Sequence, residues 1–460
     1  MVDMPTSRLA RSGKLGKFAA QQAVRNARLR FDRFANGGEA DRQAADAALL
    51  RGVDELVGIL GSMKGAAMKV GQMLSVIDIE MIPRSHRERF RTRFAALRDR
   101  APSVSFERMR PVLEEDLGRP LGDAFAEFDT EPVAAASIGQ VYRARLPDGR
   151  AVAVKVQYAG IARAVRADLK NLALLLKMSK PVFPGFSADA FMDELRLHLE
   201  EELDYLHEAA TQQELSRFYA GHPAIMVPDT VSELCGPRVL VTEYVDGARF
   251  DDVCSQPAAV RDRVGEIVFR FYIGALFRDL RFNGDPHPGN VLLTPDGRVA
   301  FLDFGLFKRM RRDAVELERE GLRAAMEGRA EALRDVMCRS GALRAGSVVT
   351  AAELLEYVYD ASPWTFDDER LTMTTEIAGG AFMVVADPRS RDFDRMRRED
   401  LPPEHFFSRR ADFYTFGMLG QLGATANWHR IAREWVYGDP PATELGALDA
   451  AWRARHHLGP

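Results

Sequence analysis

Four side chains suited to phosphate chemistry stand out in this sequence. Asp285 and Asn290 share a turn-rich stretch, and Asp303 follows one hairpin later. Lys155 lies among valines far upstream. Phosphoryl transfer needs a carboxylate near the attacking hydroxyl, oxygen ligands for Mg²⁺ and a lysine on the nucleotide phosphates, and these residues supply that set in the chain order of protein kinases.

Lys155 occupies a strand position that allows two interpretations. In AVAVKVQ (151–157) it alternates with valines and so faces away from them. On an edge strand such a lysine blocks aggregation. In a cleft it neutralises phosphate oxygens and needs an acidic partner. The helix predicted at EEELDYLHEAA (200–210) offers Asp204 and Glu208, which are four residues apart and are therefore expected on one face, where like charges repel unless a cation meets them. An ordinary solvated acidic face is the alternative for this segment.

The spacing of apolar residues predicts the elements around these side chains. From Leu49 to Leu74 the steps of three and four indicate a helix of about seven turns. The other predicted elements are a capped helix ending at Gly118, strands within 137–157 and at 238–247, and helices at 159–180 and 187–219. From about residue 250 the pattern is almost wholly helical, apart from the hairpin before Asp303. This order predicts an α+β fold of two lobes.

Four segments follow from this order of elements. They are a basic N-terminal segment (1–48), a helical extension (49–100), a smaller lobe of strands and helices (101–245) and a larger helical lobe (246–460). The two lobes are expected to join near Glu243–Gly247.

Bulk composition indicates a globular protein with more than one packed unit. The chain has 460 residues, of which 46% are hydrophobic and 28% charged, and its formal net charge is −4. This charge gives no general attraction to nucleic acid. The three cysteines lack metal-ligand spacing and are expected to be reduced thiols. No apolar run approaches the roughly 20 residues that a transmembrane helix needs, so a cytoplasmic protein without a transmembrane segment is expected.

The N-terminal residues are basic and poor in acids up to Arg33. One interpretation is a solvated tail. The other is a helix on a membrane surface, with Leu15, Phe18 and Leu29 in contact with lipid. The second interpretation predicts peripheral membrane contact.

Five short motifs together resemble one known family. They are KVGQ (69–72), AAAS (134–137), ELDYLHEA (202–209), DPHPGN (285–290) and DFG (303–305). The UbiB/AarF/ADCK group of atypical, protein-kinase-like proteins has similar motifs: K-x-G-Q, an alanine-rich replacement for the glycine-rich phosphate loop, E-x-D with a following glutamate, a catalytic loop and a metal-binding motif. The resemblance covers roughly residues 49–310.

The resemblance implies a protein-kinase-like fold whose N-terminal helical extension packs over the cleft. Lys69 and Gln72 would then approach Glu202 and Asp204, where a protein substrate would otherwise bind. Lys155 would pair with Glu208 and contact the α- and β-phosphates. Asn290 and Asp303 would hold Mg²⁺, and Asp285 would take the catalytic-base position. The remaining implied nucleotide-binding residues are Ala134, Ala135, Ala136, Ser137, Glu243 and Val245. The implied cofactors are Mg²⁺ and ATP or ADP.

The alanines of the implied phosphate loop have a physical consequence. Glycine reaches backbone conformations that alanine enters only at a cost, so a loop of alanines at 134–136 is stiffer and offers fewer amide contacts. We therefore expect a nucleotide selectivity different from that of ordinary kinases, with retention of ADP.

Two positions depart from the family pattern. Asn283 stands two residues before Asp285, where the family commonly has a histidine. Thr211 stands where the family usually has an asparagine after the Glu-Ala pair of the E-x-D helix. The first departure brings the geometry of the loop into question more than its chemistry. His287, between Pro286 and Pro288, is expected to shape the turn that presents Asn290.

These features favour an Mg²⁺·ATP-binding atypical kinase or ATPase. By resemblance it would act in isoprenoid-quinone or membrane-lipid metabolism, with a membrane lipid or quinone precursor as partner, and the extension would block phosphorylation of proteins in trans. The alternative is a nucleotide-regulated scaffold or lipid-handling pseudokinase that changes shape without a phosphoryl acceptor.

Overall fold

The computed structural model describes residues 104–179 except Ser137, residue 196, residues 199–343, residues 346–379 except 363 and 365, and residues 403–458. The chain forms two compact units. The first consists of Met1–Val112, Val133–Gln140 and Gln157–Leu203, and the second of Leu113–Pro132, Val141–Val156 and Asp204–Pro460. The predicted helix at 49–74 and the predicted site residues Lys69, Gln72 and Ser137 lie outside the described residues.

In the first unit the longest described element is the helix α7 (Ile161–Ser179), which confirms the helix predicted at 159–180. A two-point ion pair joins Arg166 on this helix to Glu200, with N–O distances of 2.8 and 2.7 Å. The amide of Gln157 donates to the Leu203 carbonyl at 2.9 Å. These contacts attach the segment before residue 204 to α7 and to Gln157, which lies four residues before the start of α7.

The strand that carries Lys155 lies inside a sheet. The strands are β1 (Glu127–Phe128), β2 (Ala134–Ala135), β3 (Gly139–Arg145), β4 (Ala151–Gln157) and β6 (Val239–Glu243), in the order β1-β3-β4-β6 with β2 also paired to β3. β3 and β4 confirm the two strands predicted around the Pro-Asp-Gly turn, where Gly149 adopts a φ of +89°. Lys155 is the register partner of Leu240, so β4 has neighbours on both sides. The edge-strand interpretation of Lys155 is wrong.

Two helices precede this sheet. They are α5 (Phe106–Leu117) and α6 (Leu121–Ala124). α5 ends where Gly118 adopts a φ of +65°, as its sequence predicted. Near that end, Asp116 accepts hydrogen bonds from the backbone and the guanidinium of Arg238, which attaches the last turn of α5 to the segment before β6.

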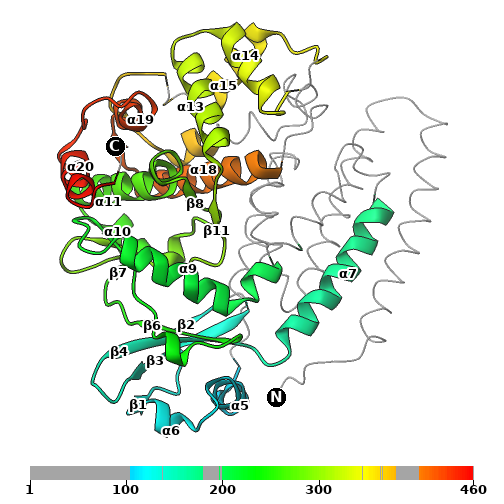
Figure 1. Cartoon of the computed structure of the whole chain (residues 1–460), viewed down its shortest axis with the longest axis vertical. Helices are drawn as coiled ribbons and strands as arrows, with labels where there is room; N and C mark the ends of the chain where they lie inside the picture. The colour runs from blue at the N-terminus through cyan, green and yellow to red at the C-terminus, as the bar shows by residue number, and fades with distance from the viewer. Residues whose placement is uncertain are drawn as a thin grey trace, which may run out of the picture. The chain divides into compact units, whose positions relative to one another are not determined.

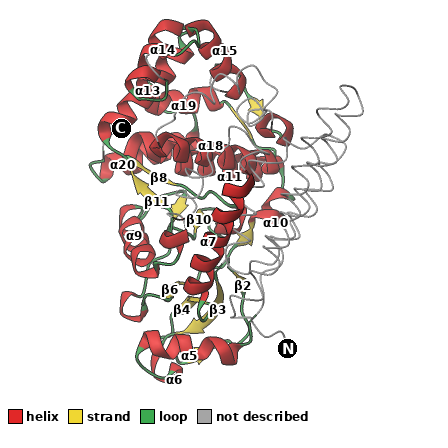
Figure 2. Ribbon diagram, turned by 90° about the vertical axis from the view of Figure 1, so that its right-hand side faces the viewer, coloured by secondary structure: helices red, strands yellow, loops and turns green. Residues whose placement is uncertain are grey.

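The helix α9 (Tyr205–Phe218) begins later than expected. The sequence predicted one helix over 187–219, but Leu203 and Asp204 interrupt it, and the Asp204 carboxylate accepts the N–H of His207 at 3.1 Å as the N-cap of α9. Asp204 and Glu208 therefore do not share a helical face, and that expectation is wrong. In both views α9 lies between the sheet of β6 and the strands β8 and β11 (Figures 1 and 2).

Helices form most of the second unit beyond residue 250, as predicted. They are α10 (Phe250–Cys254), α11 (Ala258–Phe269), α12 (Ala275–Asp279), α13 (Arg312–Met326), α14 (Ala330–Arg339), α15 (Ala351–Ala361), α18 (Pro403–Leu422), α19 (Trp428–Val436) and α20 (Glu444–Arg455). Phe269, Trp428 and Trp452 are among the large side chains buried between them. Within this region predicted as helical, the helix α18 ends at Leu422, because Gly423 adopts a φ of +58° and a short strand follows.

Short strands complete this unit. β5 (Ile225–Met226), β10 (Val299–Phe301), β9 (Val291–Leu293) and β7 (Ala248–Arg249) form one sheet in that order; β8 (Arg281–Asn283) pairs with β11 (Phe307–Arg309), and β12 (Leu371–Thr372) with β13 (Thr425–Ala426). β9 and β10 are the predicted hairpin. The other two pairs were not predicted, because strands of two or three residues show no periodicity.

A buried polar cluster anchors the C-terminal helix α20. His222 Nδ1 accepts the backbone N–H groups of Ala224 and Ile225 at 3.1 and 2.9 Å, so its Nε2–H donates to Asp449 on α20, at 3.1 Å. Arg278 on α12 also contacts the Asp449 carboxylate. Burial lowers the pKa of His222. The neutral imidazole is therefore the form that fits this cluster.

No helix among the described residues is long and apolar enough to cross a membrane. The three cysteines, all within the described part of the chain, are free thiols.

Candidate functional site

Lys155 meets two carboxylates that are distant in the sequence. Its Nζ lies 2.8 and 3.0 Å from the two oxygens of Glu208 and 3.5 Å from Oδ2 of Asp303. The ammonium also lies 4.9 Å from the ring centroid of Tyr205. Burial alone would lower the pKa of Lys155, but Asp303 and Glu208 together raise it well above its usual value. The lysine is therefore a fixed cation at neutral pH.

Glu208 is presented by the first turn of α9. The Asp204 cap fixes the start of that helix, and the Glu208 side chain is only 2% exposed. A buried carboxylate requires a cationic partner, and Lys155 supplies it. The structure thus brings together the predicted pair Lys155 and Glu208, and the solvated-face interpretation of this helix does not hold at Glu208.

Asp303 stands at the end of the β9–β10 hairpin with its carboxylate partly exposed. Its Oδ1 accepts the Gly305 N–H at 3.1 Å, and its side chain is 34% exposed, against 19% for Lys155. Phe304 is fully buried in the core of the second unit, which fixes the Asp-Phe-Gly turn. The turn thus holds in place a carboxylate that is about one third exposed.

Asn283 connects the predicted catalytic loop to the Asp-Phe-Gly turn. Its amide nitrogen donates to the Asp303 carbonyl at 2.7 Å, and its amide oxygen accepts the Asp285 N–H at 2.9 Å. The side chain is almost fully buried. Asn283, whose departure from the family pattern brought the loop geometry into question, therefore braces the loop. Its one amide hydrogen-bonds the backbone of both Asp303 and Asp285.

The turn between Asp285 and Asn290 is shaped by His287. Its Nδ1 accepts the Gly289 N–H at 3.0 Å at the start of the 3₁₀ turn η4 (Pro288–Asn290), which is the structural role expected for it. The Asn290 N–H donates to the His287 carbonyl, and the Asn290 carbonyl accepts the Leu302 N–H, both at 3.0 Å. Asn290 is thereby held beside the end of β10, one residue before Asp303.

The donor chemistry of Asn290 and Asp303 fits a hard divalent cation. Mg²⁺ prefers amide and carboxylate oxygens, and it retains waters or takes phosphate oxygens for the rest of its six ligands. Within the described part of the chain, no three His, Cys, Asp or Glu side chains gather as a metal site of their own. Asn290 and Asp303 could supply two such oxygen ligands, and water or phosphate oxygens would have to supply the others.

The predicted nucleotide-binding residues Glu243 and Val245 lie at the end of β6 and two residues beyond it. The Glu243 N–H donates to the Asp229 carbonyl at 2.8 Å, and the Tyr244 N–H to the Ala151 carbonyl at 3.0 Å. Val245 follows them, and in the described residues its backbone takes part in no hydrogen bond to other backbone groups. At Gly247 a Cβ would lie 2.8 Å from the Leu293 carbonyl oxygen, so glycine allows the backbone to pass this close to β9.

The predicted alanine loop is partly described. Ala134 and Ala135 form the exposed strand β2, and the Ala136 N–H donates to the Gly139 carbonyl at 2.8 Å. The Ala136 amide is thus already used within the loop. Glu202, the other predicted occluding residue described here, is half-buried at the end of the helical turn before Asp204.

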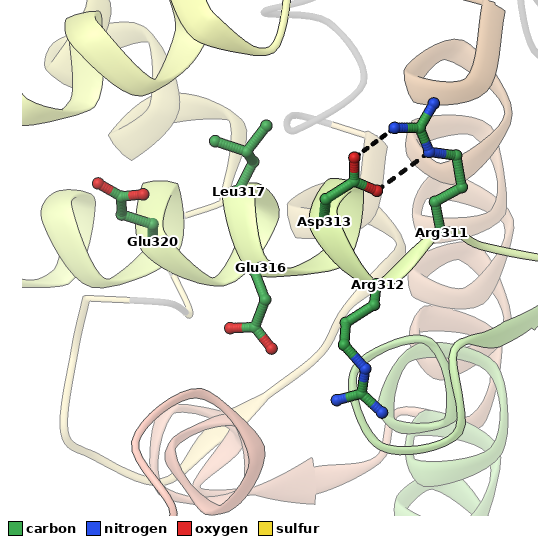
Figure 3. Close-up of a pocket in the computed structure, with 6 residues that line it drawn as sticks. All are labelled: Arg311, Arg312, Asp313, Glu316, Leu317 and Glu320. Atoms are coloured by element: carbon green, nitrogen blue, oxygen red, sulfur yellow. Dashed lines mark hydrogen bonds and ion pairs between the residues drawn. The ribbon is translucent and has the colours of Figure 1, made fainter.

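A hollow of about 890 Å³ lies elsewhere on the second unit, along the first turns of α13. It is lined by Arg311, Arg312, Asp313, Glu316, Leu317 and Glu320 (Figure 3). Arg311 pairs with Asp313, as Figure 3 shows, and Glu316 and Glu320 pair with arginines too. It shares no residue with the Lys155 cluster, and its carboxylates are already neutralised.

Comparison with known proteins agrees with this geometry. Residues 96–337 match the ABC1 atypical kinase-like domain. The chain belongs to this family. The ABC1 match supports the sequence-based assignment to the UbiB/AarF/ADCK group, and it supports an α+β, kinase-like fold.

Several relatives have informative names. Over 328 residues the chain is 32% identical to the mitochondrial atypical kinase COQ8B of Rattus norvegicus, a match that covers 71% of this chain and 61% of the relative. It is 35% identical to the chloroplastic protein ACTIVITY OF BC1 COMPLEX KINASE 1 of Arabidopsis thaliana over 55% of this chain and 37% of the relative. The chain thus spans between about a third and three fifths of these curated ABC1 proteins.

A solved structure covers more of the chain. The complex of Rv3197 with erythromycin from Mycobacterium tuberculosis superimposes with a TM-score of 0.62 and 30% sequence identity, over 87% of this chain and all of the other.

One residue beside the site of this ABC1 chain carried no signal in the sequence. Between α11 and α12 the helix contains the π-turn η3 (Arg270–Gly274). Tyr272 lies in this turn and is buried. Burial, and then the charges of Asp285 and Asp303, raise the pKa of its phenol. The backbone of His287 forms a hydrogen bond with the same phenol. Its neighbour Phe271 stacks on Phe301 with ring centroids 3.6 Å apart. The π-turn thus directs two successive aromatic rings toward the predicted catalytic loop and the strand before Asp303.

Proposed function

We propose that this chain binds an adenine nucleotide with Mg²⁺ and hydrolyses it slowly or transfers its phosphoryl group, as an atypical kinase or ATPase of the UbiB type. The observation that supports this most is the convergence of Glu208 and Asp303 on the single cation of Lys155. A buried ion pair of this kind is weak evidence for stability alone. Its position beside Asn290 and a braced Asp285 loop matches the requirements of phosphoryl transfer.

Each residue has a stated role in this proposal. Lys155, held by Glu208, would neutralise the α- and β-phosphates, and Asp285 would accept the proton of an attacking hydroxyl or water. Asn290 and Asp303 would hold Mg²⁺, which neutralises charge on the phosphates when bound. Glu243 and Val245 would contact the adenine base, and the loop of Ala134, Ala135, Ala136 and Ser137 would cover the phosphates.

The finer parts of the proposal follow from the family. The chain would form two lobes, with boundaries near residues 100 and 245, and an N-terminal extension would cover the cleft. Lys69 and Gln72, opposite Glu202 and Asp204, would then exclude protein substrates. A stiff alanine loop would favour retention of ADP. The supporting observation is the exposed β2 strand, whose following amide is engaged by Gly139.

The biological setting proposed is isoprenoid-quinone or membrane-lipid metabolism. The name of the plant relative refers to the BC1 complex, and members of the UbiB group carry the motifs found here. We propose a lipid or quinone precursor as partner and membrane contact through the basic N-terminus of this chain.

Calorimetry with ADP or ATP, in the presence and absence of Mg²⁺, tests nucleotide binding. Wild type should bind, and at a hundredfold excess over Kd the nucleotide should stabilise the protein by about 2.7 kcal/mol. Asp303→Asn should lose the Mg²⁺-dependent part of the binding, whereas Asp360→Asn, an exposed aspartate on α15, should not. Absence of any nucleotide binding by wild type would refute the proposal.

Turnover separates the two functional classes. Phosphate release is measured with and without liposomes or phenolic quinone precursors. Release by wild type that Asp285→Asn and Asp303→Asn abolish supports an enzyme. Nucleotide binding without release under every condition supports the nucleotide-regulated scaffold. An Ala135→Gly variant with unchanged affinities for both ATP and ADP would contradict the proposed role of the alanine loop.

A further inference from the structure

Two arginines stand directly opposite each other next to the site. In the antiparallel pair of β8 and β11, Arg281 is the register partner of Arg309. Like charges at such positions repel each other. Glu214 on α9 resolves this conflict, because its Oε1 lies 2.7 Å from Arg281 Nη2 and its two oxygens lie 2.5 and 2.6 Å from Arg309 Nη2. One carboxylate thus joins a helix to both strands.

A second contact fastens Arg281 to the same helix. Its guanidinium lies 4.9 Å from the ring centroid of Phe218. Phe218 follows Glu214 by four residues and so lies on the same face of α9. The side chain of Arg281 is 17% exposed, against 67% for Arg309. Because solvent screens exposed ion pairs, Arg281 should contribute more to this attachment than Arg309.

The joined strands border both halves of the candidate site. β8 leads through Asn283 into the loop of Asp285, and β11 begins shortly after Asp303. α9 itself carries Glu208, the partner of Lys155. The helix is therefore attached at two places: by Glu208 to the β4 lysine, and by Glu214 to the strands that flank the predicted catalytic loop and the Asp-Phe-Gly turn.

We propose that the Arg281–Glu214–Arg309 triad is a latch that holds α9 where Glu208 meets Lys155. Glu214 and Arg281 are then positioning residues for the nucleotide site. In protein kinases a phosphate added to the activation loop orders it through arginine pairs, and this ordering controls the helix that bears the equivalent glutamate. In this chain the carboxylate belongs to the helix itself. The latch therefore closes without modification, and the site is assembled in the unmodified protein.

Hydrogen exchange of the full chain tests the latch without nucleotide. Glu214→Gln should accelerate amide exchange about tenfold in two separate segments, residues 205–214 and residues 303–309, because both depend on the same local opening. The matched control is Glu320→Gln, which breaks an exposed glutamate–arginine pair between α13 and α14. The control should leave both segments unchanged.

Charge inversion distinguishes a latch from a general structural role. The triple variant Glu214→Arg, Arg281→Glu and Arg309→Glu rebuilds the triad with opposite charges and should restore slow exchange in both segments. Among single variants, Arg281→Met should accelerate exchange more than Arg309→Met. The latch is overturned if Glu214→Gln leaves exchange at 303–309 unchanged, or accelerates it no more than Glu320→Gln does.

The catalytic consequence rests on the proposed function and is measured separately. If wild type turns over ATP, Glu214→Gln should lower kcat about tenfold while its thermal midpoint stays close to that of Glu320→Gln. An unchanged kcat would remove the positioning role. If wild type binds no nucleotide, the proposed function fails, yet the exchange experiment still decides whether the latch exists.

Discussion

Lys155 and Glu208, on a strand and a helix separated by 53 positions, form a two-point ion pair with N–O distances of 2.8 and 3.0 Å. The glutamate is buried and the lysine nearly so, and Asp303 approaches the same ammonium. Because neither Lys155 nor Glu208 is stable in the interior without a charged partner, the pair constrains the positions of both β4 and α9.

Replacing Lys155 alone should therefore lower the free energy of unfolding more than replacing Lys155 and Glu208 together. Lys155→Met leaves the Glu208 carboxylate buried beside Asp303 and should lower the free energy of unfolding by about 3 kcal/mol. The double variant Lys155→Met/Glu208→Gln should recover part of that loss, since the remaining group is neutral. Urea unfolding of the two single variants and the double variant measures the coupling. Strictly additive effects would show that the pair does not behave as a unit.

Asn283 should affect binding more than its contribution to stability suggests. Asn283→Leu leaves the Asp303 carbonyl and the Asp285 N–H without this partner, which should cost about 2 kcal/mol of stability and weaken Mg²⁺-dependent nucleotide binding. The control Asn427→Leu removes the N-cap of α19 and should lower stability by about 1 kcal/mol without a change in nucleotide affinity. Calorimetry on both variants decides. Equal nucleotide affinities in the two would contradict a bracing role.

Two glycines on the packed helices α11 and α18, one at a close contact and one facing open space, should respond in opposite ways to alanine. A Cβ at Gly265 on α11 would lie 2.4 Å from Ala424 Cβ, so Gly265→Ala should destabilise by about 1–3 kcal/mol through overpacking. At Gly417 within α18 nothing lies within 4 Å of the added Cβ, and Gly417→Ala should stabilise by up to about 1 kcal/mol because alanine favours helix. Thermal unfolding of both variants measures this. A stable Gly265→Ala protein would mean that α11 and α18 can separate easily.

Stability should decrease in mild acid because of His222. Its folded-state pKa is lowered by burial, so the unfolded chain binds the proton more readily. The contribution of neutral His222 to the free energy of unfolding is fully present above the ordinary histidine pKa of about 6.5. As the pH falls below that value, stability decreases by up to about 1.4 kcal/mol per pH unit for one proton. Urea unfolding at pH 7.5, 6.5 and 5.5 shows the slope. His222→Gln should reduce it, whereas His207→Gln, an exposed position, should not. The same slope in His222→Gln and wild type would refute this assignment.

The sequence was informative wherever periodicity or a motif carried the signal. Alternating valines located β4 and directed Lys155 away from them, and turn residues located the hairpin before Asp303. Interruption of the helix at Asp204 was not predicted, because no glycine or proline marks it. Glu214 was missed for another reason: nothing near it in the sequence indicates that its partners are arginines on two strands far along the chain.

Very short strands and side-chain networks are decided by tertiary packing. β8 and β11 each span three residues, too few for any alternation to be visible, and their pairing depends on the fold that brings residues 281 and 309 together. The role of Asn283 also depends on tertiary packing. The sequence identified this residue as a departure from the family pattern, but it did not predict that the amide would hydrogen-bond both Asp303 and Asp285.

The π-turn at Arg270–Gly274 also affects how this helix should be aligned and engineered. A turn of this kind adds one residue to the helical repeat, so the faces before and after it are rotated by about 100° relative to an uninterrupted helix. Superposition on a protein with a regular helix here requires a gap of one residue inside the helix. Deleting one residue from the turn would preserve the helix yet rotate the Tyr272 phenol away from the Asp285 loop, so circular dichroism would be normal in a protein whose candidate site is displaced.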